Sequence, residues 1–137
     1  MTSDRAMQEE PIDEMRLVNG LTLYLYDRSR PVAGDRWLVS FVARIDVEVR
    51  PEYFKNKGAE GLDFEKIKSA LGDRVTYHHE KKRNFIAEAE KDRVFKSLKE
   101  RFLGASLGYL SSVDFPRKLI LTRYQEALGQ RVAWKRQ

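Results

Sequence analysis

The chain contains no cysteine and only two histidines among its 137 residues. The absence of cysteine excludes disulfides, thiolate metal ligands and cysteine nucleophiles. No stretch approaches the roughly 18 uninterrupted apolar residues that a membrane-spanning helix needs. The start of the chain is polar and acidic and lacks the apolar core of a secretion signal. We therefore expect a cytoplasmic protein without a membrane span.

Common catalytic and nucleotide-binding motifs are also missing. The sequence has neither GxGxxG nor GxxxxGK[ST], and no serine lies in a GxSxG elbow. A zinc site needs at least three protein ligands, whereas His78 and His79 point to opposite faces if they lie on a strand. We expect no metal and no cofactor. An enzyme without a recognisable motif stays open as a less favoured alternative.

Composition and length indicate one soluble globular domain. Hydrophobic residues make up 42% of the chain and charged residues 34%, which is an ordinary balance for such a domain. Acidic residues predominate in residues 1–20 and basic residues in residues 114–137, within a net charge of +5. We expect a flexible acidic segment, residues 1–14, followed by a single domain, residues 15–137.

Alternating apolar and polar residues predict three strands. Residues 21–27, LTLYLYD, place leucines on one face and tyrosines on the other. Residues 37–49 alternate in the same way, and their second face changes from apolar to charged. The third run, residues 75–86, has a charged middle, which is typical of an edge strand.

Helical spacing of apolar residues predicts three helices. Asp63 is expected to cap a short helix that ends at Gly72. The longest helix spans residues 87–110, and a last helix begins near Pro116 and ends before Gly129. The order β-β-α-β-α-α predicts an α+β fold in which a three-stranded antiparallel sheet packs against two to three helices.

The segment DRSRPVAGDR, between the first two predicted strands, is the first candidate site. Arginine forks onto phosphate or carboxylate, so the loop is a candidate for contacting a ligand or partner. The alternative is that its arginines and aspartates pair with one another around a long turn. Its candidate residues are Asp27, Arg28, Arg30, Asp35 and Arg36.

The segment YHHEKKR is the second candidate. We expect its basic strand residues, His79, Lys81 and Arg83, to share one face, whereas Lys82 points to the other. A strip that follows a phosphate backbone needs its cations on a common surface. Binding of nucleic acid by this strand and the basic C-terminal tail is therefore expected to be weak, and it is an alternative function.

A candidate interface lies on the second face of the predicted sheet. Its apolar residues are Tyr24, Tyr26, Leu38 and Val42. A contiguous exposed apolar patch marks a contact surface, so a homodimer or another protein partner is expected there. The alternative is that Val132 and Trp134 of the tail cover the patch. The sequence thus favours a small non-enzymatic binding or interaction module.

Overall fold

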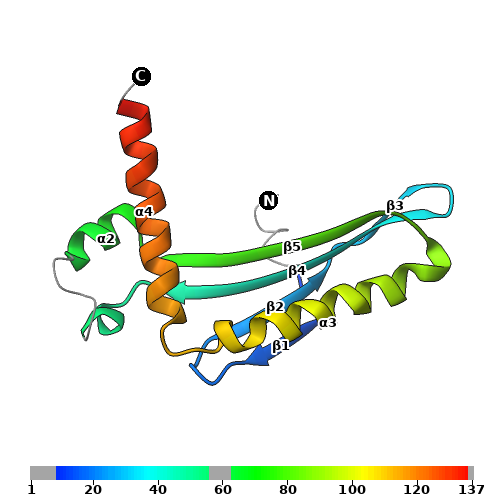
Figure 1. The fold of residues 1–137 in the computed structure, drawn as a ribbon, viewed down its shortest axis with the longest axis horizontal. Coiled ribbons are helices and arrows are strands. Elements are labelled where there is room, and N and C mark those ends of the chain that lie inside the picture. Colours follow the sequence, from blue (N-terminus) through cyan, green and yellow to red (C-terminus); the bar gives the residue numbers. More distant parts are fainter. Residues whose placement is uncertain (1–8, 56–62, 136–137) are drawn as a thin grey trace.

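A computed structural model describes residues 9–55 and 63–135, with side chains described up to Gly129 (Figure 1). The described residues form an α+β fold, as predicted, with a five-stranded antiparallel sheet and three α-helices. The elements along the chain are β1 (Asp13–Arg16), β2 (Thr22–Asp27), β3 (Arg30–Ala33), β4 (Arg36–Glu48), the 3-10 helix η1 (Pro51–Phe54), α2 (Phe64–Leu71), β5 (Arg74–Ala87), the 3-10 helix η2 (Glu88–Glu90), α3 (Lys91–Leu110) and α4 (Phe115–Lys135).

Strand β4 is the centre of the sheet. β2 and β3 pair with successive parts of one edge of β4, and β1 extends the sheet beyond β2. β5 pairs with the other edge of β4, from Arg36 to Glu48. Within the described residues β5 pairs with no further strand, so all 14 of its residues lie at an edge of the sheet.

The predicted number of strands was wrong, because β1 and β3 are missing from the sequence prediction. Each has only four residues, and neither shows a run of alternating apolar residues. All four residues of β3 are exposed. β3 forms because the chain folds back on β4 at Gly34, whose φ of 54° lies in the left-handed region that glycine tolerates.

The hydrophobic core lies between one face of the sheet and the helices. Phe41 of β4 is fully buried, and its ring centroid lies 5.8 Å from that of Phe95 and 5.4 Å from that of Phe102, both on α3. Tyr77 of β5 contacts Phe115 at the start of α4. Burial of each large apolar side chain contributes roughly 1.5–3 kcal/mol, so these contacts hold α3 and α4 on the same face.

The short helix α2 begins and ends as predicted. The side chain of Asp63 accepts hydrogen bonds from the backbone nitrogens of Glu65 and Lys66, which satisfies two donors at the helix start. Gly72 follows the last turn with a φ of 82°. α3 begins at Lys91, later than predicted, because Glu88–Glu90 form a 3-10 turn instead.

Helix α4 does not end at Gly129, contrary to the prediction, but continues to Lys135. A glycine inside a helix costs about 1 kcal/mol relative to alanine, and this is not enough to end a helix whose first turns are anchored in the core. Leu119 and Ile120 supply that anchor. The helix crosses one end of the sheet and continues beyond β5 (Figure 1).

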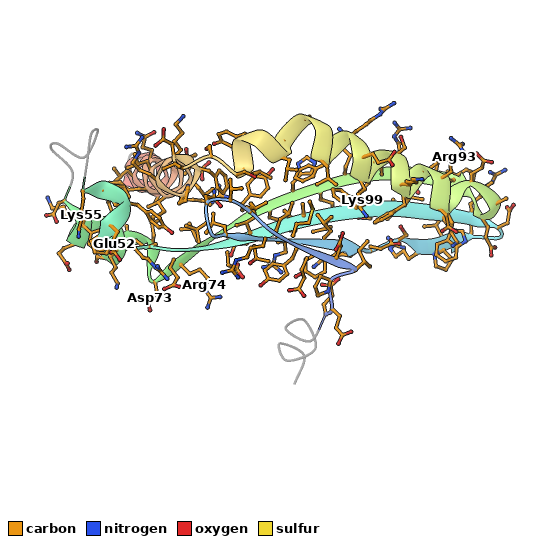
Figure 2. All side chains as sticks on the ribbon, turned by 90° about the horizontal axis from the view of Figure 1, so that it is seen from below. Glu52, Lys55, Asp73, Arg74, Arg93 and Lys99 are labelled. Atoms are coloured by element: carbon orange, nitrogen blue, oxygen red, sulfur yellow. The ribbon has the colours of Figure 1, made fainter. Side chains whose placement is uncertain are left out.

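The second face of the sheet carries no helix within the described residues. Figure 2 shows α3 and α4 on one side of the sheet and the side chain of Arg74 on the other. We call this second face the uncovered face. Its residues on β4 are Leu38, Ser40, Val42, Arg44, Asp46 and Glu48.

The N-terminal part of the chain enters the sheet earlier than the predicted domain boundary. Strand β1 begins at Asp13, two residues before Met15, and residues 1–8 of the expected flexible segment lie outside the described residues. No helix in the described ranges is long and apolar enough to cross a membrane.

Candidate functional site

The uncovered face contains a hollow of about 390 Å³, which we call the central hollow. Its lining residues are Glu9, Tyr24, Tyr26, Arg44, Asp46, Arg74 and Thr76. A second hollow of about 290 Å³ shares Tyr24 and Asp46 with it and extends to the turn between β1 and β2. The central hollow is thus part of a longer depression that crosses β2, β4 and β5.

Strand pairing brings the lining residues together. Arg44 lies opposite Tyr24 on β2 and opposite His78 on β5, and Asp46 lies opposite Thr76. Directly opposed residues of antiparallel strands point to the same face. Because Ile45 and Val47 face the helices, their neighbours Arg44 and Asp46 must face the hollow.

One wall of the central hollow is an ion pair between Glu9 and Arg28. Arg28 donates from Nε to Oε2 of Glu9 at 2.9 Å and from Nη2 to Oε1 at 2.6 Å. Its guanidinium carbon lies 5.7 Å from the ring centroid of Tyr26. The hydrogen bond from Arg28 is the main reason that the pKa of Glu9 is lowered, so this carboxylate stays ionised and engaged at neutral pH.

The opposite wall is formed by Asp46 and its neighbours on β5. Thr76 Oγ1 donates to Asp46 Oδ1 at 2.8 Å, and Arg74 Nη1 lies 3.8 Å from Asp46 Oδ2. Both oxygens of this carboxylate therefore already have a donor or a cation beside them. Contacts between residues of this chain therefore hold the Asp46 carboxylate in place.

Arg44 lies between these two walls and forms no ion pair with any residue that the structure describes. Its Nε atom is shielded from solvent and has no hydrogen-bond partner, and the guanidinium has no ion pair among the described residues. A shielded donor without a partner costs about 1–3 kcal/mol. Arg28 and Arg74 each form an ion pair with a carboxylate. Arg44 has no such pair among the described residues, although its charge helps to lower the pKa of Glu9.

Two of the loop candidates lie at the end of β2. Arg28 turns to Glu9 rather than to the aspartates of the loop, and so holds a carboxylate that lines the central hollow. Asp27 accepts a hydrogen bond from the backbone nitrogen of Ser29 at 2.9 Å. Asp27 therefore stabilises the turn locally, whereas Arg28 joins a second segment of the chain.

The other loop candidates lie along the β3–β4 hairpin. Arg36 Nε is 3.6 Å from Asp35 Oδ1, and the guanidinium of Arg36 lies 5.6 Å from the ring centroid of Phe85. Arg30 is exposed on β3. The five loop residues thus do not converge on one point, and none of them lines the central hollow; Arg28 contacts Glu9, which does.

The basic strand candidates lie on the face that carries the helices. Lys81 is opposite Phe41 and Arg83 is opposite Val39. The ring centroid of His79 lies 4.7 Å from that of Phe102. The structure therefore uses His79 as part of the packing under α3 and leaves Lys81 and Arg83 exposed at the sheet edge.

The rest of the charged segment lies on the uncovered face. Lys82 Nζ is 3.7 Å from Glu80 Oε2, and the same oxygen accepts a hydrogen bond from Ser40 at 2.9 Å. His78 is exposed. The cations of YHHEKKR are therefore divided between two faces.

The interface candidates all lie on the uncovered face but differ in exposure. Val42 is fully buried and Tyr26 is only 9% exposed, whereas Tyr24 and Leu38 are partly buried. The apolar area that the four residues present to solvent is therefore smaller than their alternation indicates. The alternative cover by Val132 and Trp134 concerns side chains outside the described ones.

The sequence interpretation did not single out most residues of the central hollow. Arg44 and Asp46 are visible as charged positions in an alternating strand, but their partners are 20–34 residues away and depend on register. Glu9 lies in a segment that was expected to be flexible. The available signal was the charge on the second face of residues 37–49.

No group of three or more histidine, aspartate or glutamate side chains is placed to hold a metal ion in the part of the chain that the structure describes. Comparison with protein families, curated proteins and solved structures finds no match for this chain.

Proposed function

We propose that this chain is a small non-enzymatic binding module that receives its ligand in the central hollow. The observation that carries the proposal is the guanidinium of Arg44, which has no ion pair among the described residues, in a hollow of about 390 Å³ on the uncovered face. Pockets for small molecules usually measure about 300–1,000 Å³. The size therefore favours a small ligand.

The protonation behaviour of the lining residues favours binding over catalysis. A general acid or base works best with a pKa near the working pH. The pKa of Glu9 is lowered, chiefly by the hydrogen bond from Arg28, and the pKa of Tyr26 is raised, chiefly by burial. Both shifts move these groups away from neutral pH, so neither is suited to exchange protons with a substrate.

A titration followed by NMR tests this proposal. The probes are phenyl phosphate, benzamide, benzylammonium and a short single-stranded oligonucleotide, which differ in charge and size. We expect at least one small probe to cause saturable shifts at the backbone amides of Tyr24, Arg44 and Thr76. The proton spectrum of the bound probe should not change with time.

Two results would contradict the proposal. Shifts confined to residues 81–83 would favour the nucleic-acid alternative, because those cations lie away from the central hollow. Conversion of a probe into a product, lost in Arg44→Gln, would favour an enzyme.

A second copy of the chain is the competing occupant of the same face. Sedimentation velocity at micromolar protein concentrations tests for it. A dimer that dissociates in the variant Tyr24→Ala would show that the uncovered face binds a second copy of the chain. The proposal of a small ligand would then give way to a homodimer interface. A monomer leaves the hollow open to a small molecule.

A further inference from the structure

We infer that the ligand of the central hollow is a small organic oxyanion, a carboxylate or phosphate monoester attached to a flat ring, and that Arg44 is its anchor. The inference rests on the proposed function and goes beyond it by naming the ligand class and the residue that selects it.

Among the charged side chains at the hollow, the guanidinium of Arg44 is the cation that has no ion pair with a described residue. Arg28 and Glu9 are joined by two hydrogen bonds, and Asp46 is held by Thr76 and Arg74. These contacts occupy both carboxylates that line the hollow. A cationic ligand would meet only carboxylates that already have a cation or donor beside them, whereas an anion would meet Arg44, which has no ion pair among the described residues.

The guanidinium of Arg44 is suited to an oxyanion with two oxygens. Its terminal nitrogens form a planar fork that matches carboxylate and phosphate. Because Nε is shielded from solvent, the rest of the guanidinium has to make the contact at the hollow. A charged hydrogen bond of this kind is stronger than a neutral one, so charge should dominate selection between probes of equal shape.

The tyrosines supply the second part of the site. Tyr24 and Tyr26 line the hollow on neighbouring outward positions of β2. Neither hydroxyl has a hydrogen-bond partner among the described residues. Burial raises the pKa of Tyr26, so its hydroxyl stays protonated and can donate to an anion at neutral pH. The aromatic rings favour a flat ring in the ligand.

Carboxylates beyond the hollow favour a small anion over a long one. Glu48 lines the adjoining hollow toward the turn between β1 and β2. Glu80 lies further along β5 on the same face. A polyanion that extended from Arg44 in either direction would approach these negative charges, whereas a single ring with one anionic group fits between them.

The test compares probes of matched shape and different charge. Benzoate and benzamide have nearly the same size, and phenyl phosphate and inorganic phosphate separate the contribution of the ring from that of the anion. NMR titration at constant ionic strength should show benzoate or phenyl phosphate binding at least about tenfold more tightly than benzamide, a ratio that corresponds to about 1.4 kcal/mol. Inorganic phosphate should bind more weakly than phenyl phosphate.

Substitutions then show which charged side chain is responsible for the affinity for the anionic ring probes. Arg44→Gln should weaken the binding of the anionic ring probes at least about tenfold, which again corresponds to about 1.4 kcal/mol. Arg44→Lys keeps the charge without the planar fork and should fall between Arg44→Gln and the native chain. Lys82→Gln is the matched control, because it removes a cation from the same face outside the central hollow. It should leave the affinity unchanged.

The outcomes separate the inference from the proposed function. Benzamide or benzylammonium binding in the hollow as tightly as benzoate would overturn the anion assignment while leaving binding there intact. Unchanged binding of the anionic ring probes to a folded Arg44→Gln variant would also overturn the assignment of Arg44 as the anchor, while leaving binding in the hollow intact. If Arg44→Gln does not fold, the comparison of benzoate with benzamide in the native chain decides. If no probe binds in the hollow, both the inferred ligand class and the proposed function are overturned.

Discussion

The imidazole of His79 lies against the phenyl ring of Phe102, with 4.7 Å between the ring centroids. This contact places one of the two histidines in the packing under α3, although the segment around it is charged. Burial is the main reason that the pKa of His79 is lowered, and the charges of Lys81 and His78 add to the effect. His79 therefore links the pH of the solution to the stability of the fold.

The free energy of unfolding should fall as the pH drops from neutrality through 6.5, the ordinary pKa of histidine. The unfolded chain takes up a proton on His79 first, because the pKa in the folded protein is lower. The stabilising effect is complete above 6.5 and is lost progressively down to the folded pKa. Urea unfolding at neutral and mildly acidic pH measures it.

The variant His79→Phe keeps a ring against Phe102 and removes the titrating group. It should therefore lose less stability on acidification than the native chain does. His78→Asn leaves the contact in place and removes only the smallest of the three causes of the shift, so it should respond to pH much more like the native chain than His79→Phe does. An identical pH response in His79→Phe and the native chain would show that His79 does not contribute.

The side chain of Asn19 connects the turn between β1 and β2 to the junction of α3 and α4. Its Nδ2 donates to the carbonyl oxygens of Leu110 and Ser112, both at 2.9 Å, and its Oδ1 accepts from the backbone nitrogen of Leu21. Asn19→Ala should lower the free energy of unfolding by about 1–3 kcal/mol, because it leaves partly buried groups without partners. Chemical denaturation measures this change.

The variant Asn19→Asp tests whether stability depends on the hydrogen bonds that Nδ2 of Asn19 donates. It keeps the acceptor for Leu21 but removes both donors, so it should be at least as destabilising as Asn19→Ala. Asn84→Ala is the control, because the Asn84 side chain accepts only from the backbone of the next residue. Native stability in Asn19→Asp would mean that the link between the two turns is unimportant.

Two glycines should respond in opposite directions to alanine. Gly72 has a φ of 82° and a ψ of −157°, a conformation that essentially only glycine adopts and that costs another residue roughly 1–3 kcal/mol. Gly104 lies inside α3, where an added Cβ meets nothing within 4 Å. Gly72→Ala should therefore lower the melting temperature, whereas Gly104→Ala should raise it through a gain of up to about 1 kcal/mol in helix propensity. A change of the same sign in both would be contrary to this expectation.

Binding of single-stranded RNA or DNA is expected to be weak and to disappear with a modest increase in salt. Lys81 and Arg83 lie on the helix-bearing face, whereas Lys82 lies on the uncovered face beside Glu80. Few phosphates would be contacted at once, which gives a shallow salt dependence. Fluorescence anisotropy across a salt series should show this. Submicromolar binding at physiological salt that is lost in Lys81→Ala combined with Arg83→Ala would favour nucleic-acid recognition instead.

The sequence predicted those strands whose alternation extends over six residues or more. β2, β4 and β5 meet this condition, and most of their apolar positions are buried or partly buried, although Phe85 of β5 is 63% exposed. β1 and β3 have four residues each, and their pairing depends on the long neighbours beside them. Local alternation therefore could not reveal them.

The central hollow was harder to predict than the strands because it depends on register. Alternation places Arg44 on the second face of the sheet, but it does not show that Tyr24 lies opposite or that Glu9 and Arg28 join beside it. Dense charge along the chain instead points to the segments DRSRPVAGDR and YHHEKKR. In the structure the side chains of these charged segments point in several directions. Arg44, which has no ion pair among the described residues, lies outside both segments, in strand β4.

A crystal structure with 4-bromophenyl phosphate is the most direct test of binding in the central hollow. The anomalous signal of bromine locates the ring, and the electron density locates the phosphate. We predict the phosphate within hydrogen-bond distance of the terminal nitrogens of Arg44, with the ring beside Tyr24 or Tyr26. A probe found only beside Lys81 and Arg83 on β5, or a central hollow that stays empty when the probe is present at millimolar concentration, would contradict this prediction.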